Sequence, residues 1–445
     1  MTRIGLVVLD TLRKDAFEDY FEWLPGTYYP NTYSTANWTV PAHASLFTGY
    51  YSTEVNATAK STSLDTPDPV LAELFRDAGF RTVGYSANPN VSTKTQFNRG
   101  FEEFTDPTEL KNPEGTDTMN PEVYGGTTDK EGLALYLGAL REILLGDYDT
   151  IPSIKLGIGQ KFGYRPWQKS IDDDGASVVR DEIEADHPAR NQFTFVNLME
   201  AHTPYDPPAE FSTVDEPVSV TLQNMVEGVD DPEKVRRAYD DAARYLSHVY
   251  KSIFESMAAD YDYVVTLSDH GEMLGEHGMW NHTYGLYSQL TNVPLVITDC
   301  SELDASFVDE RPVSLVDVHR TLLELAGLSA PSRGMDLRTS FDPVDRLLEF
   351  NGLIEPALKG LHDAGVDQSE IDHYDRDFRA VVTDDAEYGV DAEDVPPELT
   401  SDLRERLTAI VAEFDDRSST EPDEDTEETE LGRETKAQLE DLGYM

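Results

Sequence analysis

The first ten residues hold the feature that most restricts the fold of this chain. Residues 4–9 form a nearly continuous apolar run rich in β-branched side chains, and Asp10 follows directly. Such a run is typical of a strand buried on both faces, and strands of this kind occur in parallel sheets with helices on both sides. The run therefore predicts an α/β fold with Asp10 at the carboxyl end of a central strand, where open parallel sheets bind their ligands.

The rest of the chain alternates between helical and extended patterns. Apolar residues with a helical period, often ended by Gly, indicate helices, and short apolar runs indicate strands. Expected helices cover residues 69–78, 133–145, 232–257, 287–291, 315–325 and 398–414; expected strands cover 81–87, 193–198, 263–267 and 293–298, with a short antiparallel pair within 378–390. This order predicts a mostly parallel central sheet flanked by helices.

Pattern and composition divide the chain into three parts. Residues 1–340 are expected to form the main domain, with an insertion at about 106–190, where the periodicity weakens. Residues 341–414 are expected to form a small C-terminal α+β subdomain. Residues 415–445 are an acidic linker and terminal segment, because their low-complexity, highly charged composition is typical of segments without a core.

The charge of the chain is strongly negative. It has 86 Asp and Glu against 35 Lys and Arg, a formal net charge of −51, although 39 % of its residues are hydrophobic. This balance argues against nucleic acid as a partner, because the phosphate backbone would be repelled. An acidic surface around a normal share of apolar residues predicts a protein from a halophilic archaeon, kept soluble where concentrated salt screens its charges.

The sequence predicts neither a targeting signal nor a transmembrane segment. The apolar stretch before Asp10 is too short for a signal peptide, and no run of about 18 apolar residues occurs elsewhere. Cys300 is the single cysteine, so an intrachain disulfide is excluded. We expect a soluble cytoplasmic protein in a high-salt cytosol.

Thr39 heads a segment, residues 39–49, that has the signals of a helix. Pro41 lies near its start and Gly49 at its end. The first turn of a helix offers unpaired N–H groups and the positive end of the helix dipole, which favour an anion or an alkoxide. Thr39 is therefore either an ordinary helix cap or a nucleophile, and this segment alone leaves both interpretations open.

Polar side chains follow three of the expected strands. They are Asp10, His202 and the pair Asp269 and His270, while Thr39 begins the helix after the first strand. Carboxylates, an imidazole and an alkoxide form a ligand set that suits Mn²⁺, Zn²⁺ or Mg²⁺. Each residue alone is better explained as a cap or a core histidine. The metal hypothesis depends on their occurrence at successive strand ends.

Several motifs occur together in an order that identifies a family. Residues 268–282 read Ser-Asp-His-Gly-Glu-Met-Leu-Gly-Glu-His-Gly-Met-Trp-Asn-His. Apolar packing does not explain a run that is so dense in Gly and His. The other motifs are residues 8–13, 39–49, 100–104, 202–205, 292–297, 317–327 and 439–444. With them the chain resembles the sulfatase-like branch of the alkaline phosphatase superfamily, which implies an alkaline-phosphatase-like fold across residues 1 to about 340.

The resemblance also implies a nucleophile. In true sulfatases a Cys or Ser becomes formylglycine within a Cys-x-Pro-x-Arg pattern, and here Thr39 and His43 occupy the Cys and Arg positions. Oxidation of a threonine would give a ketone instead of the aldehyde, so we expect no formylglycine. The chain is therefore similar to family members with a Thr nucleophile, which transfer phosphoryl or phosphoglycerol-type groups.

The resemblance implies one divalent metal ion, Mn, Zn, Mg or Ca, held by Asp10, Thr39, Asp269 and His270. The branch of the family with two zinc ions adds an Asp-x-x-x-His pair. No His in this chain has an Asp four residues before it. We therefore expect a single metal ion.

Four further histidines have roles implied by the resemblance. His202 and His282 are expected to be catalytic and to contact the substrate's non-bridging oxygens or leaving group, as general acid or charge stabiliser. His43 is expected to lie near the substrate, with packing as the alternative. His277 is expected to orient the glycine-rich loop.

Three functions follow as expectations. The first is a metal-dependent hydrolase or transferase of phosphate esters (phosphodiester, phosphomonoester or phosphoglycerol-type) that works through a covalent Thr39 intermediate. The second is a sulfuric ester hydrolase that works without formylglycine, and the third is a non-catalytic, metal- and ligand-binding member of the family. The expected partner is a small-molecule, glycan or lipid-head-group ester, and the oligomeric state stays open.

Overall fold

A computed structural model describes residues 2–111, 140–141, 171–340 and 344–413. The predicted acidic segment 415–445 and most of the predicted helix 133–145 lie outside these residues. The boundaries predicted near residues 340 and 414 therefore stay predictions.

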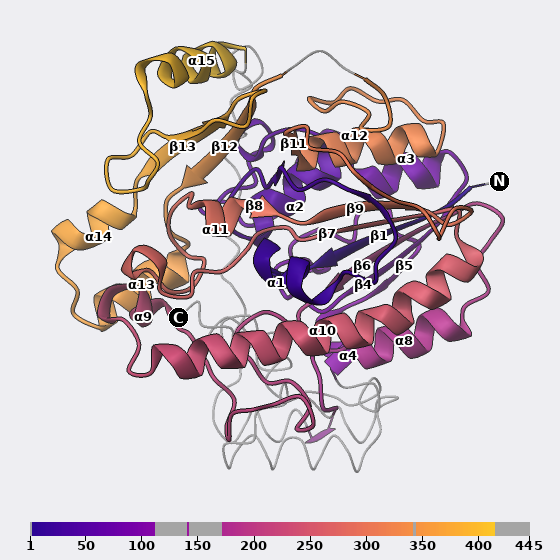
Figure 1. Cartoon of the computed structure of the whole chain (residues 1–445), viewed down its shortest axis with the longest axis horizontal. Helices are drawn as coiled ribbons and strands as arrows, with labels where there is room; N and C mark the ends of the chain where they lie inside the picture. The colour runs from indigo at the N-terminus through magenta and orange to yellow at the C-terminus, as the bar shows by residue number, and fades with distance from the viewer. Residues whose placement is uncertain (1, 112–139, 142–170, 341–343, 414–445) are drawn as a thin grey trace.

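An eight-stranded sheet forms the centre of the molecule (Figure 1), in the order β10-β2-β9-β7-β1-β6-β4-β5. The five neighbours from β7 to β5 are parallel, and β9 runs antiparallel to both β7 and β2. The strands are β1 Arg3–Leu9, β2 Gly26–Tyr28, β4 Arg81–Ser86, β5 Glu103–Thr105, β6 Gln192–Leu198, β7 Tyr263–Leu267, β9 Leu295–Asp299 and β10 Ser306–Val308. The mostly parallel central sheet predicted from the sequence is confirmed.

The register of the sheet brings several strand ends together. β1 pairs with β6 on one side and β7 on the other, with Leu9 opposite Leu198 and Val8 opposite Leu267. All but the first residue of β1 are fully buried, as the apolar run predicts. The residues that follow β1, β6 and β7 therefore lie at one edge of the sheet.

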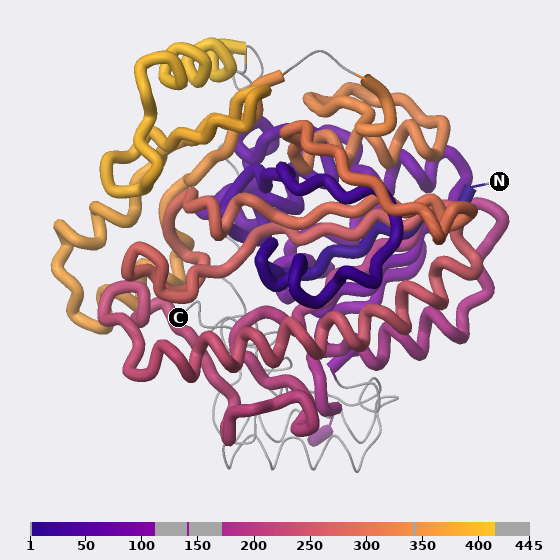
Figure 2. The backbone as a smooth tube through the Cα atoms, viewed as in Figure 1, coloured from indigo at the N-terminus to yellow at the C-terminus, as the bar shows by residue number. Residues whose placement is uncertain are grey.

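Helices cover both faces of this sheet, as Figures 1 and 2 show. One face carries α2 Thr39–Thr48, α3 Leu71–Asp77 and α12 Leu315–Leu325. The other carries α1 Lys14–Tyr20, α4 Pro107–Lys111, α8 Ala176–Ala185 and α10 Pro232–Asp260. Helix α12 packs on α2 and α10 packs on α8. The result is a three-layered α/β/α arrangement.

Helix α10 shows how the sequence builds this layer. Pro232 occupies the first turn, and the side chain of Asp231 accepts a hydrogen bond from the backbone N–H of Lys234, so the helix begins with a satisfied cap. Its buried residues recur every three or four positions. They include Val235, Ala238, Tyr239, Ala242, Leu246, Val249, Ile253 and Met257. This apolar stripe fastens the helix to the sheet.

The C-terminal part contains a small antiparallel sheet. Its strands are β12 Arg346–Asn351, β13 Asp377–Val382 and β14 Tyr388–Val390, accompanied by α13 Glu355–Asp363, α14 Gln368–Tyr374 and α15 Ser401–Ala412. The predicted strand pair and the final helix are confirmed. A third small sheet joins β11 Val313–Ser314, β3 Thr32–Tyr33 and β8 Asn292–Val293 next to α11 Ser288–Thr291, and α9 Leu222–Glu227 precedes α10.

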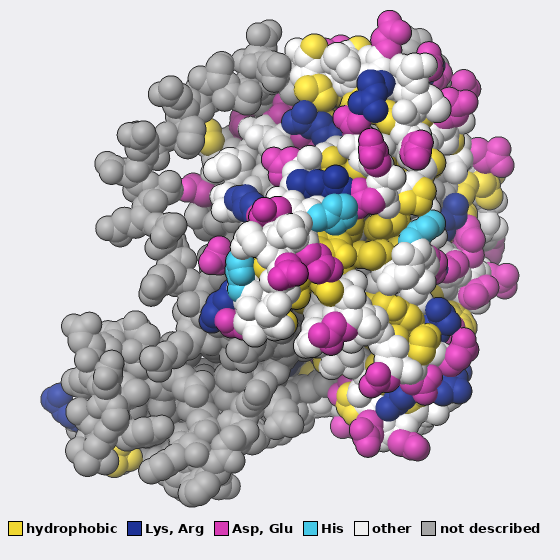
Figure 3. All heavy atoms as spheres, turned by 90° about the vertical axis from the view of Figure 1, so that its left-hand side faces the viewer, with side chains coloured by type: hydrophobic (Ala, Val, Ile, Leu, Met, Phe, Trp, Pro, Cys, Tyr) yellow, Lys and Arg dark blue, Asp and Glu magenta, His cyan; other side chains and the backbone are white. Residues whose placement is uncertain are grey.

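The surface carries the negative charge that the composition requires. Acidic side chains are spread over the face shown in Figure 3, with fewer basic ones between them. No helix among the described residues is both long and apolar enough to span a membrane.

Candidate active site

The edge of the sheet gathers three of the four predicted metal ligands. Asp10 follows β1, and Asp269 and His270 follow β7; one ligand atom from each lies within 4.8 Å of the others. All three side chains are fully buried. The fourth residue, Thr39, joins them from the start of α2, because its Oγ1 lies 3.3 Å from Nε2 of His270.

Thr39 does not serve as a helix cap. The N-cap of α2 is Trp38, whose side chain makes no capping hydrogen bond, and Thr39 is the first helical residue. Its hydroxyl instead accepts a hydrogen bond from Nδ2 of Asn88, at 3.2 Å, and faces His270. The interpretation of Thr39 as an ordinary cap is therefore wrong.

One oxygen atom of each carboxylate makes no hydrogen bond among the described residues. Oδ2 of Asp10 accepts hydrogen bonds from Nδ2 of Asn88 (2.7 Å) and Nδ2 of Asn197 (3.3 Å), and Oδ1 of Asp269 accepts one from the backbone N–H of Thr11 (3.4 Å). Oδ1 of Asp10 and Oδ2 of Asp269 have no hydrogen-bond partner among the described residues. Unpartnered buried carboxylate oxygens are costly. Two such atoms beside an imidazole nitrogen fit a divalent cation.

The electrostatics of the cluster point the same way. Burial, with repulsion from Asp269, raises the pKa of Asp10 to about 7, and burial raises the pKa of Asp269 to about 7. Burial also lowers the pKa of His270, which favours the neutral imidazole that binds metals. As ions the two carboxylates repel each other, and a cation between them would offset that repulsion.

His43 lies one turn after Thr39 in the fully buried helix α2, next to Asp269. Its Nδ1 is 3.0 Å from the carbonyl oxygen of Thr39 and 3.4 Å from Oδ2 of Asp269, and its Nε2 is 3.0 Å from Nδ2 of Asn197. Burial lowers the pKa of His43 to about 3, so the ring is neutral. Both ring nitrogens contact protein groups, and the substrate contact expected of His43 stays a prediction.

His202 and His282 lie beside the cluster. The ring centroid of His282 is 5.1 Å from that of His202 and 4.6 Å from that of His270, and all three rings are buried. Burial lowers the pKa of His202 to about 3 and that of His282 well below its ordinary value. His277 is exposed and stacks on Tyr287, with ring centroids 5.3 Å apart.

Three residues of the site were not predicted. Asn88 and Asn197 bind Asp10, and Glu272 contacts His282, with its Oε1 3.2 Å from Nδ1 of the imidazole. Asn197 is a polar residue near the carboxyl end of a mostly apolar strand, and Glu272 belongs to the Gly- and His-rich motif, so both carried a signal. Asn88 follows a strand, as Asp10 does, but an isolated amide gives no specific pattern.

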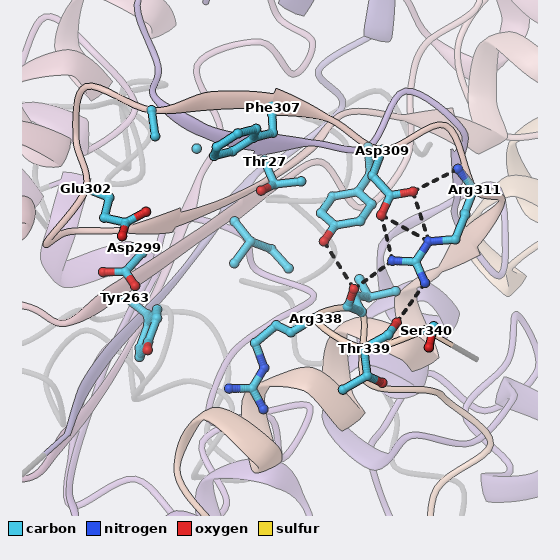
Figure 4. A pocket seen from close by; sticks show the side chains of 15 residues that line it. Thr27, Tyr263, Asp299, Glu302, Phe307, Asp309, Arg311, Arg338, Thr339 and Ser340 are labelled. Atoms are coloured by element: carbon cyan, nitrogen blue, oxygen red, sulfur yellow. Dashed lines mark hydrogen bonds and ion pairs between the residues drawn. The ribbon is translucent and has the colours of Figure 1, made fainter.

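A separate cavity of about 600 Å³ lies away from this cluster (Figure 4). It opens between β2, β9 and β10, and Arg311 on its wall is held by Asp309 and by the carbonyl oxygens of Leu337 and Thr339. Tyr263, at the start of β7, also lines it. The cluster lies beyond the other end of β7, roughly 16 Å away for a five-residue strand.

Comparison with solved structures supports the fold. The chain is similar to the phosphonate monoester hydrolase of Silicibacter pomeroyi, with a TM-score of 0.58 and 17 % identity over 94 % of this chain and 96 % of that one. It is also similar to a 2-O GAG sulfatase, with a TM-score of 0.55 and 15 % identity over 94 % and 93 % of the two chains.

Comparison of sequences identifies the family. Choline-sulfatase of Rhizobium meliloti is 29 % identical over 147 residues, which is 32 % of this chain and 27 % of that protein. The chain matches only between 18 and 27 % of the length of its curated relatives. The family model described as Sulfatase matches residues 20–328, more than half of the chain. The chain belongs to the sulfatase family, whose fold is that of the alkaline phosphatase superfamily.

Proposed function

We propose that this protein is a metal-dependent hydrolase or transferase of phosphate esters, with Thr39 as the nucleophile that forms a covalent intermediate. One observation carries the proposal: the buried hydroxyl of Thr39 lies 3.3 Å from His270, in a cluster where Asp10 and Asp269 each present an unpartnered oxygen. A hydroxyl beside metal-binding groups at a helix start is suited to attack phosphorus.

Asp10, Thr39, Asp269 and His270 would together hold one divalent cation, Mn, Zn, Mg or Ca. When bound, such an ion lowers the pKa of a hydroxyl ligand and offsets the charge of the ester oxygens. The chain's own contribution is to orient these ligands: Asn88 donates to both Asp10 and Thr39, which fixes the hydroxyl beside the carboxylate. No formylglycine is required, because the side-chain oxygen of Thr39 is itself the nucleophile.

The reaction has two displacements. The oxygen of Thr39 attacks phosphorus, and the leaving oxygen departs from the opposite side. Water or an acceptor hydroxyl then resolves the phosphothreonine. His202 and His282, whose rings lie 5.1 Å apart, serve the non-bridging oxygens and the leaving group. Whether water or an alcohol is the second acceptor decides between hydrolase and transferase.

Phosphate is favoured over sulfate because of residue 39. A sulfatase of this family depends on Cys or Ser there, and Thr cannot provide the aldehyde. The similar fold of a phosphonate monoester hydrolase supports a phosphorus substrate. The family match and choline-sulfatase support the second candidate, a sulfuric ester hydrolase without formylglycine. A non-catalytic binding protein is the third, although it would need no nucleophile beside its metal ligands.

A substrate panel separates these candidates. Aryl sulfate, phosphate monoester, phosphodiester and phosphonate monoester substrates would be compared in molar KCl with added Mn²⁺. Preference for a phosphorus ester, lost on chelation and in Asp269→Asn, is the expected result. Preference for the sulfate ester would favour the sulfuric ester hydrolase over the phosphate-ester enzyme. Metal uptake without turnover of any ester would favour the non-catalytic binding protein.

The acidic surface also supports a proposal about the setting. We propose that the protein works in the high-salt cytosol of a halophilic archaeon, because a formal charge of −51 is tolerated best where salt screens it.

A further inference from the structure

A strained turn follows the first strand, between Leu9 and Leu12. The backbone N–H of Leu12 donates to the carbonyl oxygen of Leu9 at 3.2 Å, and Thr11 inside this turn has a φ of 57°. This left-handed conformation suits Gly or Asn, whereas a β-branched residue such as Thr disfavours it. Thr11 therefore needs contacts that hold it in this conformation.

Tyr239 supplies such a contact. Its hydroxyl donates a hydrogen bond of 3.0 Å to the carbonyl oxygen of Thr11 and accepts one of 2.8 Å from the backbone N–H of Arg13. The hydroxyl of Thr11 adds a hydrogen bond of 2.7 Å to the carbonyl oxygen of Asp10. A single tyrosine hydroxyl, used as both donor and acceptor, therefore joins two backbone groups of the turn.

The tyrosine reaches this turn from the long helix α10. That helix packs against α1 (Figure 1), and Arg13 is the N-cap of α1. The ring of Tyr239 is buried and packs edge to face on Tyr205, with ring centroids 5.4 Å apart. Because a side chain in a close-packed interior has little freedom to move, its hydroxyl is a fixed point for the turn.

The turn carries one proposed metal ligand and helps to orient another. Asp10 lies in the turn itself. The N–H of Thr11, one of the backbone donors that face Asp269, lies 3.4 Å from Oδ1 of that carboxylate. A change of φ at Thr11 rotates the peptide group before it relative to the chain after it. Such a change would therefore displace Asp10 and this N–H together.

We propose that Tyr239 is a positioning residue of the metal site: its hydroxyl keeps Thr11 in the left-handed conformation and so places Asp10 and Asp269 for a divalent cation. This inference rests on the metal ligands of the proposed function and holds for any ester. Asn88 acts on the side chain of Asp10, whereas Tyr239 acts on the backbone that carries it.

Titration calorimetry of the full chain with Mn²⁺ tests this role. Tyr239→Phe removes only the hydroxyl, and we expect the Kd for Mn²⁺ to rise about 10-fold, the lower end of the range for residues that orient metal ligands. Tyr245→Phe is the matched control, because Tyr245 lies on the same helix and its hydroxyl donates at 2.6 Å to Asp173, which is not a proposed ligand. The control should bind Mn²⁺ as the wild type does. An unchanged Kd in Tyr239→Phe, or an equal rise in both variants, would overturn the proposal.

A second substitution separates positioning from a general loss of packing. Gly adopts the left-handed conformation without the steric cost that Thr meets, so a chain with Thr11→Gly needs the hydroxyl of Tyr239 less. Thr11→Gly combined with Tyr239→Phe should therefore regain most of the Mn²⁺ affinity that Tyr239→Phe alone loses, with Thr11→Gly alone as the reference. A double variant that binds Mn²⁺ as weakly as Tyr239→Phe would overturn the proposal.

These readouts keep the role of Tyr239 apart from the proposed function. Weaker Mn²⁺ binding in Tyr239→Phe, with no turnover of any phosphate ester by the wild type, would support the role and contradict the phosphate-ester function. Turnover of a phosphate ester, with equal Mn²⁺ affinity in the wild type and Tyr239→Phe, would do the reverse. Wild-type protein that binds none of Mn²⁺, Zn²⁺, Mg²⁺ and Ca²⁺ would contradict the metal site on which both depend.

Discussion

At the scale of single residues, Asp10 and Asp269 determine the electrostatics of the site. Both are fully buried, and burial raises the pKa of each to about 7. One oxygen of each has no hydrogen-bond partner among the described residues. Protons or a cation must therefore compensate these charges, and the two compete for the same atoms.

This competition predicts how pH changes the effect of metal on stability. In the metal-free protein the folded pKa values of about 7 lie above the ordinary 3.8. The two groups then contribute stability that is fully present below pH 3.8 and lost as the pH rises through 7. Added Mn²⁺ should therefore raise the midpoint of thermal unfolding more at about pH 8 than at about pH 5.5. Circular dichroism would measure it, and equal shifts at both pH values would contradict the assignment.

Asn88 supplies a second prediction at this scale. Its amide donates to Asp10 at 2.7 Å and to Thr39 at 3.2 Å, so it orients two of the proposed ligands. Asn88→Ala should weaken Mn²⁺ binding about 10- to 100-fold, as loss of a residue that orients metal ligands usually does. Titration calorimetry checks this. Asn90→Ala, on the same loop but without a described contact to the ligands, is the control and should bind as the wild type does.

The sequence predicted the proposed metal ligands better than the residues that hold those ligands in place. Asp10, Asp269 and His270 follow expected strands, so the parallel sheet itself brings them together. Asn88 and Asn197 act through contacts between segments far apart in the chain, and although Asn197 stands out in its strand, no local pattern predicts which residue either amide contacts. Their roles depend on the register of β6 beside β1 and of β4 beside β6.

At the scale of elements, buried strands and long amphipathic helices were predictable from the sequence. Some strand boundaries, and strands that depend on tertiary pairing, were not. The predicted strand 263–267 and helix 315–325 have the observed bounds. The predicted strand 293–298 divides into β8 and β9 at Pro294, which has no N–H for the ladder. The strand β12 was not predicted, although it pairs with β13 along its whole length, because that pairing is tertiary.

The cap of α10 gives a prediction for this scale. Asp231 accepts a hydrogen bond from the N–H of Lys234 at the start of a 29-residue helix. Asp231→Ala should lower the free energy of unfolding by about 1 kcal/mol. Chemical denaturation in concentrated KCl measures this. The exposed neighbour Asp230 has no cap contact, so Asp230→Ala should change the stability by less than about 0.5 kcal/mol.

At the scale of the whole molecule, the net charge is the dominant feature. A formal charge of −51 on a folded chain produces self-repulsion that salt screens, with a Debye length that falls from about 10 Å at 0.1 M to about 3 Å at 1 M. The midpoint of thermal unfolding should therefore rise with KCl, most steeply below about 1 M. A midpoint that stays constant from dilute to molar KCl would contradict the halophilic setting.

The fold and the family depend on most of the chain and not on a few residues. Residues 20–328 match the sulfatase family, and the α/β/α architecture agrees with solved structures that share under a fifth of the sequence. Such low identity leaves the choice between phosphorus and sulfur to individual residues. Thr39 is the residue that decides it in our account.

The most direct test of that account is a search for phosphothreonine at residue 39. The wild-type chain would be mixed with a phosphodiester and Mn²⁺, quenched within the first turnover and digested for mass spectrometry. We predict a phosphorylated or phosphodiester-modified peptide that contains Thr39, absent without metal and absent in Thr39→Ala, which should also lose turnover. Turnover by Thr39→Ala at the wild-type rate, with no modified peptide in the wild type, would contradict it.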